Sequence, residues 1–207
     1  PFKEQAWQLA DSRTPYAEHA KAVNTLKVQT DGTLLGANTD GMGLVRDLQQ
    51  NQQVNLAGKR ILLLGAGGAV RGVIQPLLEA KPASLFIANR TADKALTLAY
   101  DFADLGTVQG GGFAEIQGQY DVIINGTSAS LQNDLPPLPD NCLAENGVTY
   151  DMIYSVNPTA FVQWGQAHQA AKALDGLGML VEQAAEAYYL WRNIRPNTEI
   201  VMRELRP

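Results

Sequence analysis

A cluster of small residues, Gly65-Ala66-Gly67-Gly68-Ala69, separates an apolar run at 60–64 from an amphipathic stretch at 70–79. Glycines at a strand-to-helix turn let the backbone approach a pyrophosphate, and the helix offers free N–H groups and the positive end of its dipole. A strict G-x-G-x-x-G would need a third glycine where this chain has Val70. The loop therefore predicts dinucleotide binding, with a simple tight turn as the alternative.

The end of the next predicted strand, 84–88, distinguishes between the two nicotinamide dinucleotides. NAD sites usually place Asp or Glu there to hold the ribose 2′-hydroxyl. This chain instead has Asn89-Arg90-Thr91, with Lys94 one helical turn further on. An acid would repel a 2′-phosphate, whereas an arginine pairs with it and stacks on the adenine. We therefore expect NADP(H), the alternative being that Arg90 is a solvated surface charge.

The elements that must position these residues alternate along the chain. Buried or alternating apolar runs predict strands at 84–88, 121–125 and 148–152 in addition to the one at 60–64, with helices at 70–79 and 92–102. Such alternation predicts βαβ units and a doubly wound parallel sheet, an α/β fold.

The flanking segments have other patterns. Before the sheet, we expect a helix over 2–10, a loop over 11–16, a hairpin from 22–28 and 33–36, and a helix over 42–49. After it, helices are expected over 158–172 and 180–191 with a turn at 176–179 between them, and a short helix at the end.

Composition excludes several classes of protein. The 207 residues are 45% hydrophobic and 18% charged, as in an ordinary globular protein. Sixteen Lys and Arg against 21 Asp and Glu give a net charge of −5, which disfavours nucleic acid as a partner. We expect no membrane span and no signal peptide. The single cysteine, Cys142, is expected to be structural and indicates a reducing compartment, and no residue cluster has the spacing of a metal site.

Several motifs together resemble the shikimate dehydrogenase family in order and spacing, along the whole chain. Besides the glycine loop and Asn89-Arg90-Thr91, they are Pro1-Phe2-Lys3, Ala22-Val23-Asn24-Thr25, Asn38-Thr39-Asp40-Gly41, Asn125-Gly126-Thr127-Ser128, Tyr150-Asp151-Met152 and Asp175-Gly176-Leu177-Gly178-Met179. The resemblance implies a Rossmann-like NADP domain, the remainder of a second α/β substrate domain, and NADPH-dependent reversible reduction of 3-dehydroshikimate to shikimate, a step towards chorismate and the aromatic amino acids.

The resemblance also implies roles for individual residues. Lys3 would be the catalytic lysine and Asp40 its partner, with Asn24, Asp40, Tyr154 and Gln183 on the substrate. Thr127, Met152, Gly176 and Met179 would line the nicotinamide side. Hydride delivery to a ketone leaves an alkoxide that needs a proton and a positive charge, and a protonated lysine supplies both. Taken singly, these residues have plainer interpretations: Lys3 as a solvated charge, and Asp40 as a helix N-cap.

The family pattern further predicts how the chain is divided. Residues 1–40 resemble the end of the substrate domain, 41–175 the NADP domain with a connecting helix, and 176–207 helices that return to the substrate domain. The family's substrate domain begins earlier than Pro1, so we expect the activity of this chain alone to be reduced or absent. Alternatives are an NAD-dependent quinate/shikimate dehydrogenase and a non-catalytic NADP-binding module. We expect a cytoplasmic monomer or homodimer acting on a small molecule.

Overall fold

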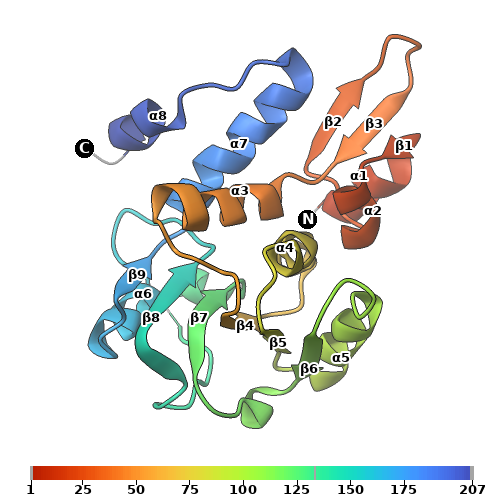
Figure 1. The fold of residues 1–207 in the computed structure, drawn as a ribbon. Coiled ribbons are helices and arrows are strands. Elements are labelled where there is room, and N and C mark those ends of the chain that lie inside the picture. Colours follow the sequence, from red (N-terminus) through yellow and green to blue (C-terminus); the bar gives the residue numbers. More distant parts are fainter. Residues whose placement is uncertain (1, 133, 206–207) are drawn as a thin grey trace.

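Two β-sheets organise the chain in the computed structural model, which describes residues 2–132 and 134–205 (Figure 1). In this described part, six parallel strands form the larger sheet, in the order β6-β5-β4-β7-β8-β9. Their bounds are β4 (Arg60–Leu64), β5 (Ser84–Ala88), β6 (Val108–Gly111), β7 (Tyr120–Asn125), β8 (Leu143–Asp151) and β9 (Lys172–Leu174). The expected doubly wound parallel sheet is confirmed, and the order reverses direction between β4 and β7, where such sheets bind ligands.

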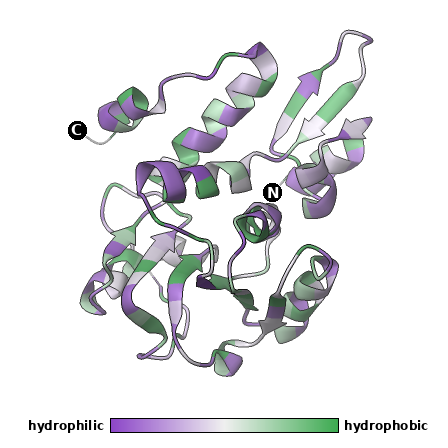
Figure 2. Ribbon diagram, in the orientation of Figure 1, coloured by the Kyte–Doolittle hydropathy of each residue, from purple (hydrophilic) through white to green (hydrophobic). Residues whose placement is uncertain are grey.

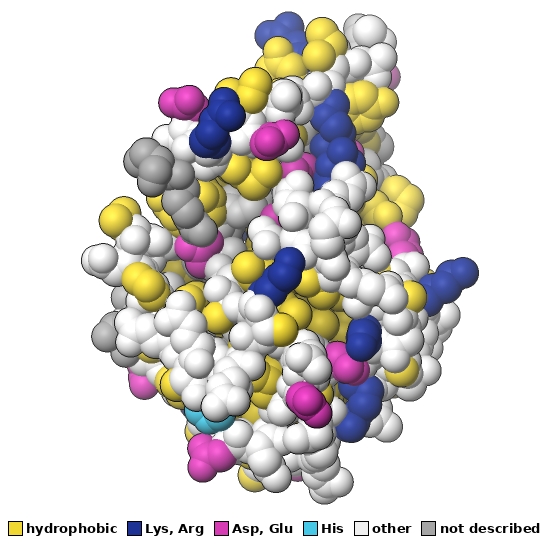
Figure 3. Space-filling model, turned by 60° about the vertical axis from the view of Figure 1, so that its left-hand side comes forward, with side chains coloured by type: hydrophobic (Ala, Val, Ile, Leu, Met, Phe, Trp, Pro, Cys, Tyr) yellow, Lys and Arg dark blue, Asp and Glu magenta, His cyan; other side chains and the backbone are white. Residues whose placement is uncertain are grey.

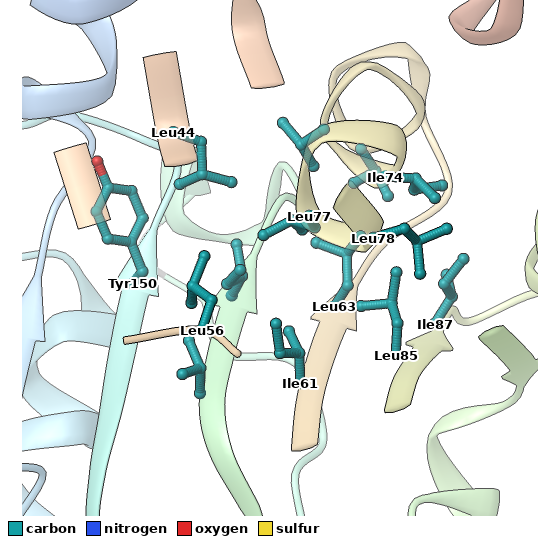
Figure 4. Packing of buried hydrophobic residues seen from close by; sticks show 14 of the residues in the cluster. Leu44, Leu56, Ile61, Leu63, Ile74, Leu77, Leu78, Leu85, Ile87 and Tyr150 are labelled. Atoms are coloured by element: carbon teal, nitrogen blue, oxygen red, sulfur yellow. The ribbon is translucent and has the colours of Figure 1, made fainter. Parts of the chain in front are cut away.

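The strand β4 shows why an unbroken apolar run becomes a central strand. Its residues Ile61 to Leu64 are all fully buried. Ile61 and Leu63 face one core cluster, whereas Leu62 and Leu64 face another on the opposite side of the sheet. Figure 4 shows the first cluster, in which Leu63 lies beside Leu77 and Leu78 of a covering helix. Apolar colour accordingly runs along the central strands in Figure 2.

Helices cover both faces of this sheet. They are α4 (Gly68–Glu79), α5 (Ala92–Asp101) and α6 (Ala160–Ala167), with short 3-10 turns η2 (Phe113–Glu115) and η3 (Ala129–Gln132) in the connections. The helix expected over 158–172 is wrong at its end. His168 ends α6, Gln169 takes a left-handed φ of 57°, and the chain then enters β9, which pairs with β8.

A smaller sheet of order β1-β3-β2 is built by the first forty residues. The expected hairpin is confirmed as β2 (Thr25–Val28) against β3 (Leu34–Ala37), preceded by α1 (Lys3–Leu9). The loop expected over 11–16 is wrong, because β1 (Ser12–Arg13) pairs with β3 and α2 (Pro15–Ala20) begins there. Thr14 caps α2 by accepting a hydrogen bond from Ala17 N. Pro15, which had suggested a loop, is instead the first residue of this helix, a position that suits proline.

Two further helices lie beside both sheets. The helix α3 (Asp40–Arg46), which continues as a π-helical turn η1 (Asp47–Asn51), packs on α7 (Leu177–Arg192). A Cβ at Gly43 would lie 2.7 Å from the backbone N of Gln183, so this close crossing requires glycine. The expected turn at 176–179 is wrong, since Gly176 caps α7 and Leu177 already belongs to it.

The last helix, α8 (Thr198–Leu205), packs against α7. No helix among the described residues is long and apolar enough to cross a membrane. On the face drawn in Figure 3, basic and acidic side chains are interspersed among uncharged ones, and some of them lie next to each other.

Candidate active site

A lysine and a carboxylate from distant parts of the chain meet between the two sheets. Lys3 Nζ donates a hydrogen bond to Asp40 Oδ2 and forms an ion pair with it. Asp40 is the first residue of α3 and is buried, while the Lys3 side chain remains 37% exposed. The interpretation of Asp40 as a helix N-cap is wrong, because Thr39 holds the cap position and the Asp40 carboxylate turns to Lys3 instead.

An amide network extends this pair. Asn24 Nδ2 donates to Asp40 Oδ1 at 2.8 Å and to Thr39 Oγ1 at 3.0 Å, and lies 3.4 Å from Gln183 Oε1 on α7. Asn24 Oδ1 in turn accepts from the Thr39 backbone N at 3.1 Å. The backbone N of Val23 donates to the carbonyl of Lys3, so the strand entry holds the start of α1 in place. The structure thus brings four of the predicted site residues into one polar cluster.

The cluster lines one side of a cavity of about 520 Å³. The opposite side is mainly apolar, with Met152, Met179 and Gly176 at the ends of β8 and α7. The predicted Tyr154 and Thr127 also line it. Sequence reasoning did not assign Gly126, Ser128, Ile153 and Leu180 to the site. Gly126 and Ser128 belong to the family motif at 125–128, whereas Ile153 and Leu180 are neighbours of predicted residues and carry no signal of their own. Polar groups facing an apolar wall suit a hydroxylated ring beside a flat aromatic one.

The glycine loop lines a second cavity, also of about 520 Å³, together with Asn89, Arg90 and residues 134–137. Ala69, Gly126, Thr127 and Ser128 line both cavities, so the two are neighbours along one side of the sheet. Also missed were Phe113, Ala129, Gln132, Asp134, Leu135, Pro136 and Pro137, which have no pattern that marks a ligand site.

The loop geometry fits a dinucleotide. A Cβ at Gly67 or Gly68 would meet nothing within 4 Å, so the backbone here faces open space, and no side chain caps α4 at Gly67. Gly65 takes a φ of 107°, which favours glycine. Val70 is tolerated at the third motif position because Gly126 lies opposite, where a Cβ would approach Val70 Cγ2 to 2.4 Å. The unsatisfied first turn of α4 therefore faces a cavity that can accept a pyrophosphate.

The residues expected at the 2′-phosphate follow β5 but do not line a single cavity. Arg90 is exposed and lines the second cavity, with Asn89, whose Nδ2 donates to the Thr91 carbonyl at 2.9 Å. Lys94 lines a third cavity, of about 690 Å³, which Gly67 and Gly68 also line. Thr91 takes the N-cap position of α5 and lines none of these three cavities.

Within residues 2–132 and 134–205, no three His, Cys, Asp or Glu side chains are grouped as a metal site would need. The expectation of a metal-free protein stays a prediction. Cys142 is fully buried in the core cluster around Leu62 and Phe161, and burial raises the pKa of its thiol to about 11, as expected of a structural residue.

A glycine-rich turn at the switch point of a parallel sheet, with a Lys–carboxylate–amide cluster in the neighbouring cavity, defines a nicotinamide-dinucleotide oxidoreductase. Family models place the chain more narrowly. The model described as "Shikimate / quinate 5-dehydrogenase" matches residues 47–133, and that of the "Shikimate 5'-dehydrogenase C-terminal domain" matches 176–206.

Individual relatives agree with the family models. A protein from Hahella chejuensis named "Shikimate dehydrogenase (NADP(+))" is 59% identical over 100% of this chain and 76% of its own length. The crystal structure of an enzyme from Pseudomonas putida has a TM-score of 0.90 at 42% identity, covering 99% of this chain and 75% of that one. A shikimate 5-dehydrogenase from Thermus thermophilus, solved with NADP(H) and shikimate, gives 0.85 at 32% identity over 100% and 76%. The chain belongs to the shikimate dehydrogenase family.

Proposed function

We propose that this protein catalyses the NADPH-dependent, reversible reduction of 3-dehydroshikimate to shikimate, a step in aromatic amino acid biosynthesis. The observation that carries the proposal is the Lys3–Asp40 pair, which faces the Met152 and Met179 wall across one cavity. That cavity adjoins the one formed by the glycine loop. The identity of the substrate is inferred from the relatives that are named shikimate dehydrogenase.

The chemistry follows from the positions of the side chains. When bound, NADPH supplies the hydride that reduces the ketone. Lys3 gives the positive charge that stabilises the developing alkoxide and the proton that neutralises it, from Nζ to the former carbonyl oxygen. Asp40 holds Lys3 in place through Oδ2 and can accept a hydrogen bond from a neighbouring substrate hydroxyl. In the reverse direction, the neutral amine of Lys3 takes the hydroxyl proton.

Further residues give the ring its orientation. Asn24 and Gln183 carry both donors and acceptors, so they suit hydroxyl groups, which also have both. Tyr154 lines the same cavity and borders the substrate. Met152, Gly176 and Met179 form an apolar wall for the nicotinamide, and Thr127 stands where the two cavities adjoin. Every group in this assignment is within one cavity, which pre-orients the reacting partners.

The cofactor preference depends on the residues after β5. Gly65, Ala66, Gly67, Gly68 and Ala69 would hold the pyrophosphate. Arg90 would pair with the 2′-phosphate, supported by Asn89 and Thr91. Lys94 would add long-range attraction from the adjacent cavity, as an exposed cation close to the loop. No acidic residue follows β5 directly, so none at this strand end repels a 2′-phosphate, although Asp134 lines the same cavity as Arg90.

The proposal includes an organisation and a location. Residues 1–40 belong to the substrate domain, 41–175 to the NADP domain, and 176–207 return to the substrate side; Pro1, Arg206 and Pro207 lie outside the described residues. The protein would work as a monomer or homodimer in the cytoplasm, where NADPH is available and a free thiol such as Cys142 remains reduced.

The test is a fluorescence titration of the purified chain with NADPH and NADH, followed by 3-dehydroshikimate. Tight NADPH binding and weak NADH binding are expected of this chain, and NADP⁺ formation on adding the substrate is expected of the active enzyme. Equal affinity for the two cofactors would contradict the assignment of Arg90. Binding of NADPH without turnover, in a form of the protein that includes the family's full substrate domain, would contradict the enzymatic proposal.

A further inference from the structure

A buried carboxylate, Asp151, lies behind both cavities without touching either. It ends β8 and is fully buried. Its Oδ2 accepts hydrogen bonds from the hydroxyls of Ser130 and Thr159, each at 2.6 Å. Its Oδ1 accepts from Asn125 Nδ2 at 3.2 Å and from the backbone N of Ile153 at 3.1 Å. One side chain thus joins the ends of two strands, the η3 turn and the start of α6.

The direction of these hydrogen bonds is fixed by the surrounding donors. Asn125 Nδ2 donates to Ser130 Oγ at 3.1 Å, and the backbone N of Val162 donates to Thr159 Oγ1 at 3.2 Å. Each hydroxyl therefore already accepts one hydrogen bond and has its own proton to give to Asp151. All four donors point at the carboxylate, which is the arrangement that stabilises its ionised form. Burial raises the pKa of Asp151, and these hydrogen bonds oppose that rise.

A second layer of hydrogen bonds reaches the cavity. Asn125 commits its amide group to the carboxylate, so its Oδ1 faces the opposite way and accepts from Thr127 N at 3.1 Å and Thr127 Oγ1 at 2.8 Å. Thr127 therefore gives its hydroxyl proton to the interior. Its oxygen accepts from the backbone N of Ala129 at 3.3 Å, and its second lone pair remains available at the place where the two cavities adjoin.

The same carboxylate also sets the opposite wall. The bond from the Ile153 backbone N turns the chain directly after Met152, while Met152 N donates to the carbonyl of Asn125 at 2.8 Å. The two segments that follow β7 and β8 are thereby tied to each other. Both contribute residues to the first cavity, Thr127 from one and Met152 from the other.

We propose that Asp151 is a positioning residue for hydride transfer. Through Asn125 and Ser130 it holds the loop after β7 and the segment after β8 in a fixed position relative to each other. It also makes Thr127 Oγ1 a hydrogen-bond acceptor, suited to an amide or hydroxyl donor on the cofactor. This proposal rests on the proposed function. Displacement of reacting groups by about 1 Å can cost on the order of 100-fold in rate, so a rigid tie between these segments has a direct kinetic value.

The test uses two variants and a matched control. Asp151→Asn keeps the shape and removes the charge, and Ser130→Ala, a milder change, removes one donor. The control is Thr149→Val, on the same strand, whose fully buried hydroxyl makes no hydrogen bond with the rest of the described chain. Each is measured in the ligand-free chain by amide hydrogen exchange at Thr127 and Ile153, and then by NADPH titration.

In the active enzyme, we would also measure kcat and the KM values for both substrates. The isotope effect is measured with NADPH deuterated at the position of the transferred hydrogen. In both Asp151→Asn and Ser130→Ala, we expect the Thr127 amide to exchange roughly tenfold faster and NADPH to bind about tenfold more weakly. Both variants should also have a lower kcat and a larger isotope effect. The control should change none of these. The proposal would be overturned if Asp151→Asn and Ser130→Ala lowered only the thermal stability and left the amide exchange rate, the NADPH affinity and the isotope effect unchanged. If the parent protein binds no NADPH, the proposed function fails, while the exchange measurement still decides whether Asp151 orders the two segments.

Discussion

Lys3 and Asp40 form an ion pair at the wall of the first cavity although 37 residues separate them in the chain. The pair depends on two local features. The helix α3 begins at Asp40, whose carboxylate accepts hydrogen bonds from Lys3 and Asn24. The carbonyl of Lys3 accepts from Val23 N, which fixes the start of α1 next to Asn24, the residue directly before β2. The first residues of two helices, α1 and α3, thus create a charged site that neither helix contains alone.

Replacing this lysine tests its catalytic role. In the active enzyme, Lys3→Ala is expected to lower kcat by about 10²- to 10⁴-fold, because the developing alkoxide loses its proton source and its neighbouring charge. The NADPH dissociation constant should stay the same, since Lys3 does not line the cavity of the glycine loop. Lys59→Ala is the matched control: Lys59 also pairs with a carboxylate, Asp121, at 3.2 Å, but neither residue lines the first or the second cavity. Near-normal turnover of Lys3→Ala would refute the assignment.

The cofactor assignment leads to a second prediction. Arg90→Ala should weaken NADPH binding by about 10- to 100-fold, because a charge-assisted hydrogen bond to the 2′-phosphate contributes about 1.5–3 kcal/mol. NADH binding should change little, as NADH has no such phosphate. Fluorescence titration with both cofactors measures the difference. Arg192→Ala, at another exposed arginine in the last turn of α7, is the control. An equal loss for both cofactors would place Arg90 on the adenosine instead of the phosphate.

The large sheet was predictable where its strands have a local signal. The run from Ile61 to Leu64 is apolar because both of its faces are buried, and β4 has the predicted limits. The strand β6 was missed because it contains Gly110 and Gly111, and glycine has low strand propensity. Its glycine is required by packing, since a Cβ at Gly110 would lie 2.2 Å from the Ala95 carbonyl of α5. That contact exists only in the folded protein.

The site was predictable only in part, for a similar reason. The glycines between a strand and a helix, and Arg90 after the next strand, can be interpreted from the neighbouring sequence alone. The pairing of Lys3 with Asp40 has no local signal and came from the family resemblance. The role of Asp151 was not predicted at all, because its four donors come from residues between 125 and 159 that the sheet and α6 assemble. Buried polar networks of this kind depend on tertiary structure.

A third prediction concerns a buried tyrosine that connects β8 of the large sheet to η1 and α7. The Tyr150 hydroxyl donates to Asp47 Oδ2 at 2.6 Å and accepts from Met179 N at 3.1 Å. Tyr150→Phe leaves the buried Asp47 carboxylate one donor short, so we expect a loss of about 1–3 kcal/mol in the free energy of unfolding. Urea denaturation measures this, and Tyr100→Phe, at an 84% exposed tyrosine, should change it by less than about 0.5 kcal/mol.

The pH dependence of that effect has a definite sign. Burial, reinforced by the charge of Asp47, raises the pKa of Tyr150 well above its usual value of 10.0. A group whose pKa is raised on folding contributes stability that is fully present below its unfolded pKa and is lost as the pH rises through its folded pKa. The difference between the parent chain and Tyr150→Phe should therefore be constant from pH 6 to about 9, and narrow only above about 10. A difference that changes steadily between pH 6 and 9 would show that Tyr150 acts through another titrating group.

The last prediction distinguishes a structural cysteine from a reactive one. Cys142 is fully buried, and burial raises the pKa of its thiol to about 11. At pH 8 only about one thiol in a thousand would then be ionised, and the thiolate is the form that reacts with iodoacetamide. Mass spectrometry should find the native chain unmodified under conditions that fully alkylate glutathione, and modified at Cys142 once urea unfolds it. Alkylation of the folded chain at a rate near that of glutathione would mean that the segment around Cys142 opens readily, which its packing beside Ile123 and Leu143 in the buried cluster argues against.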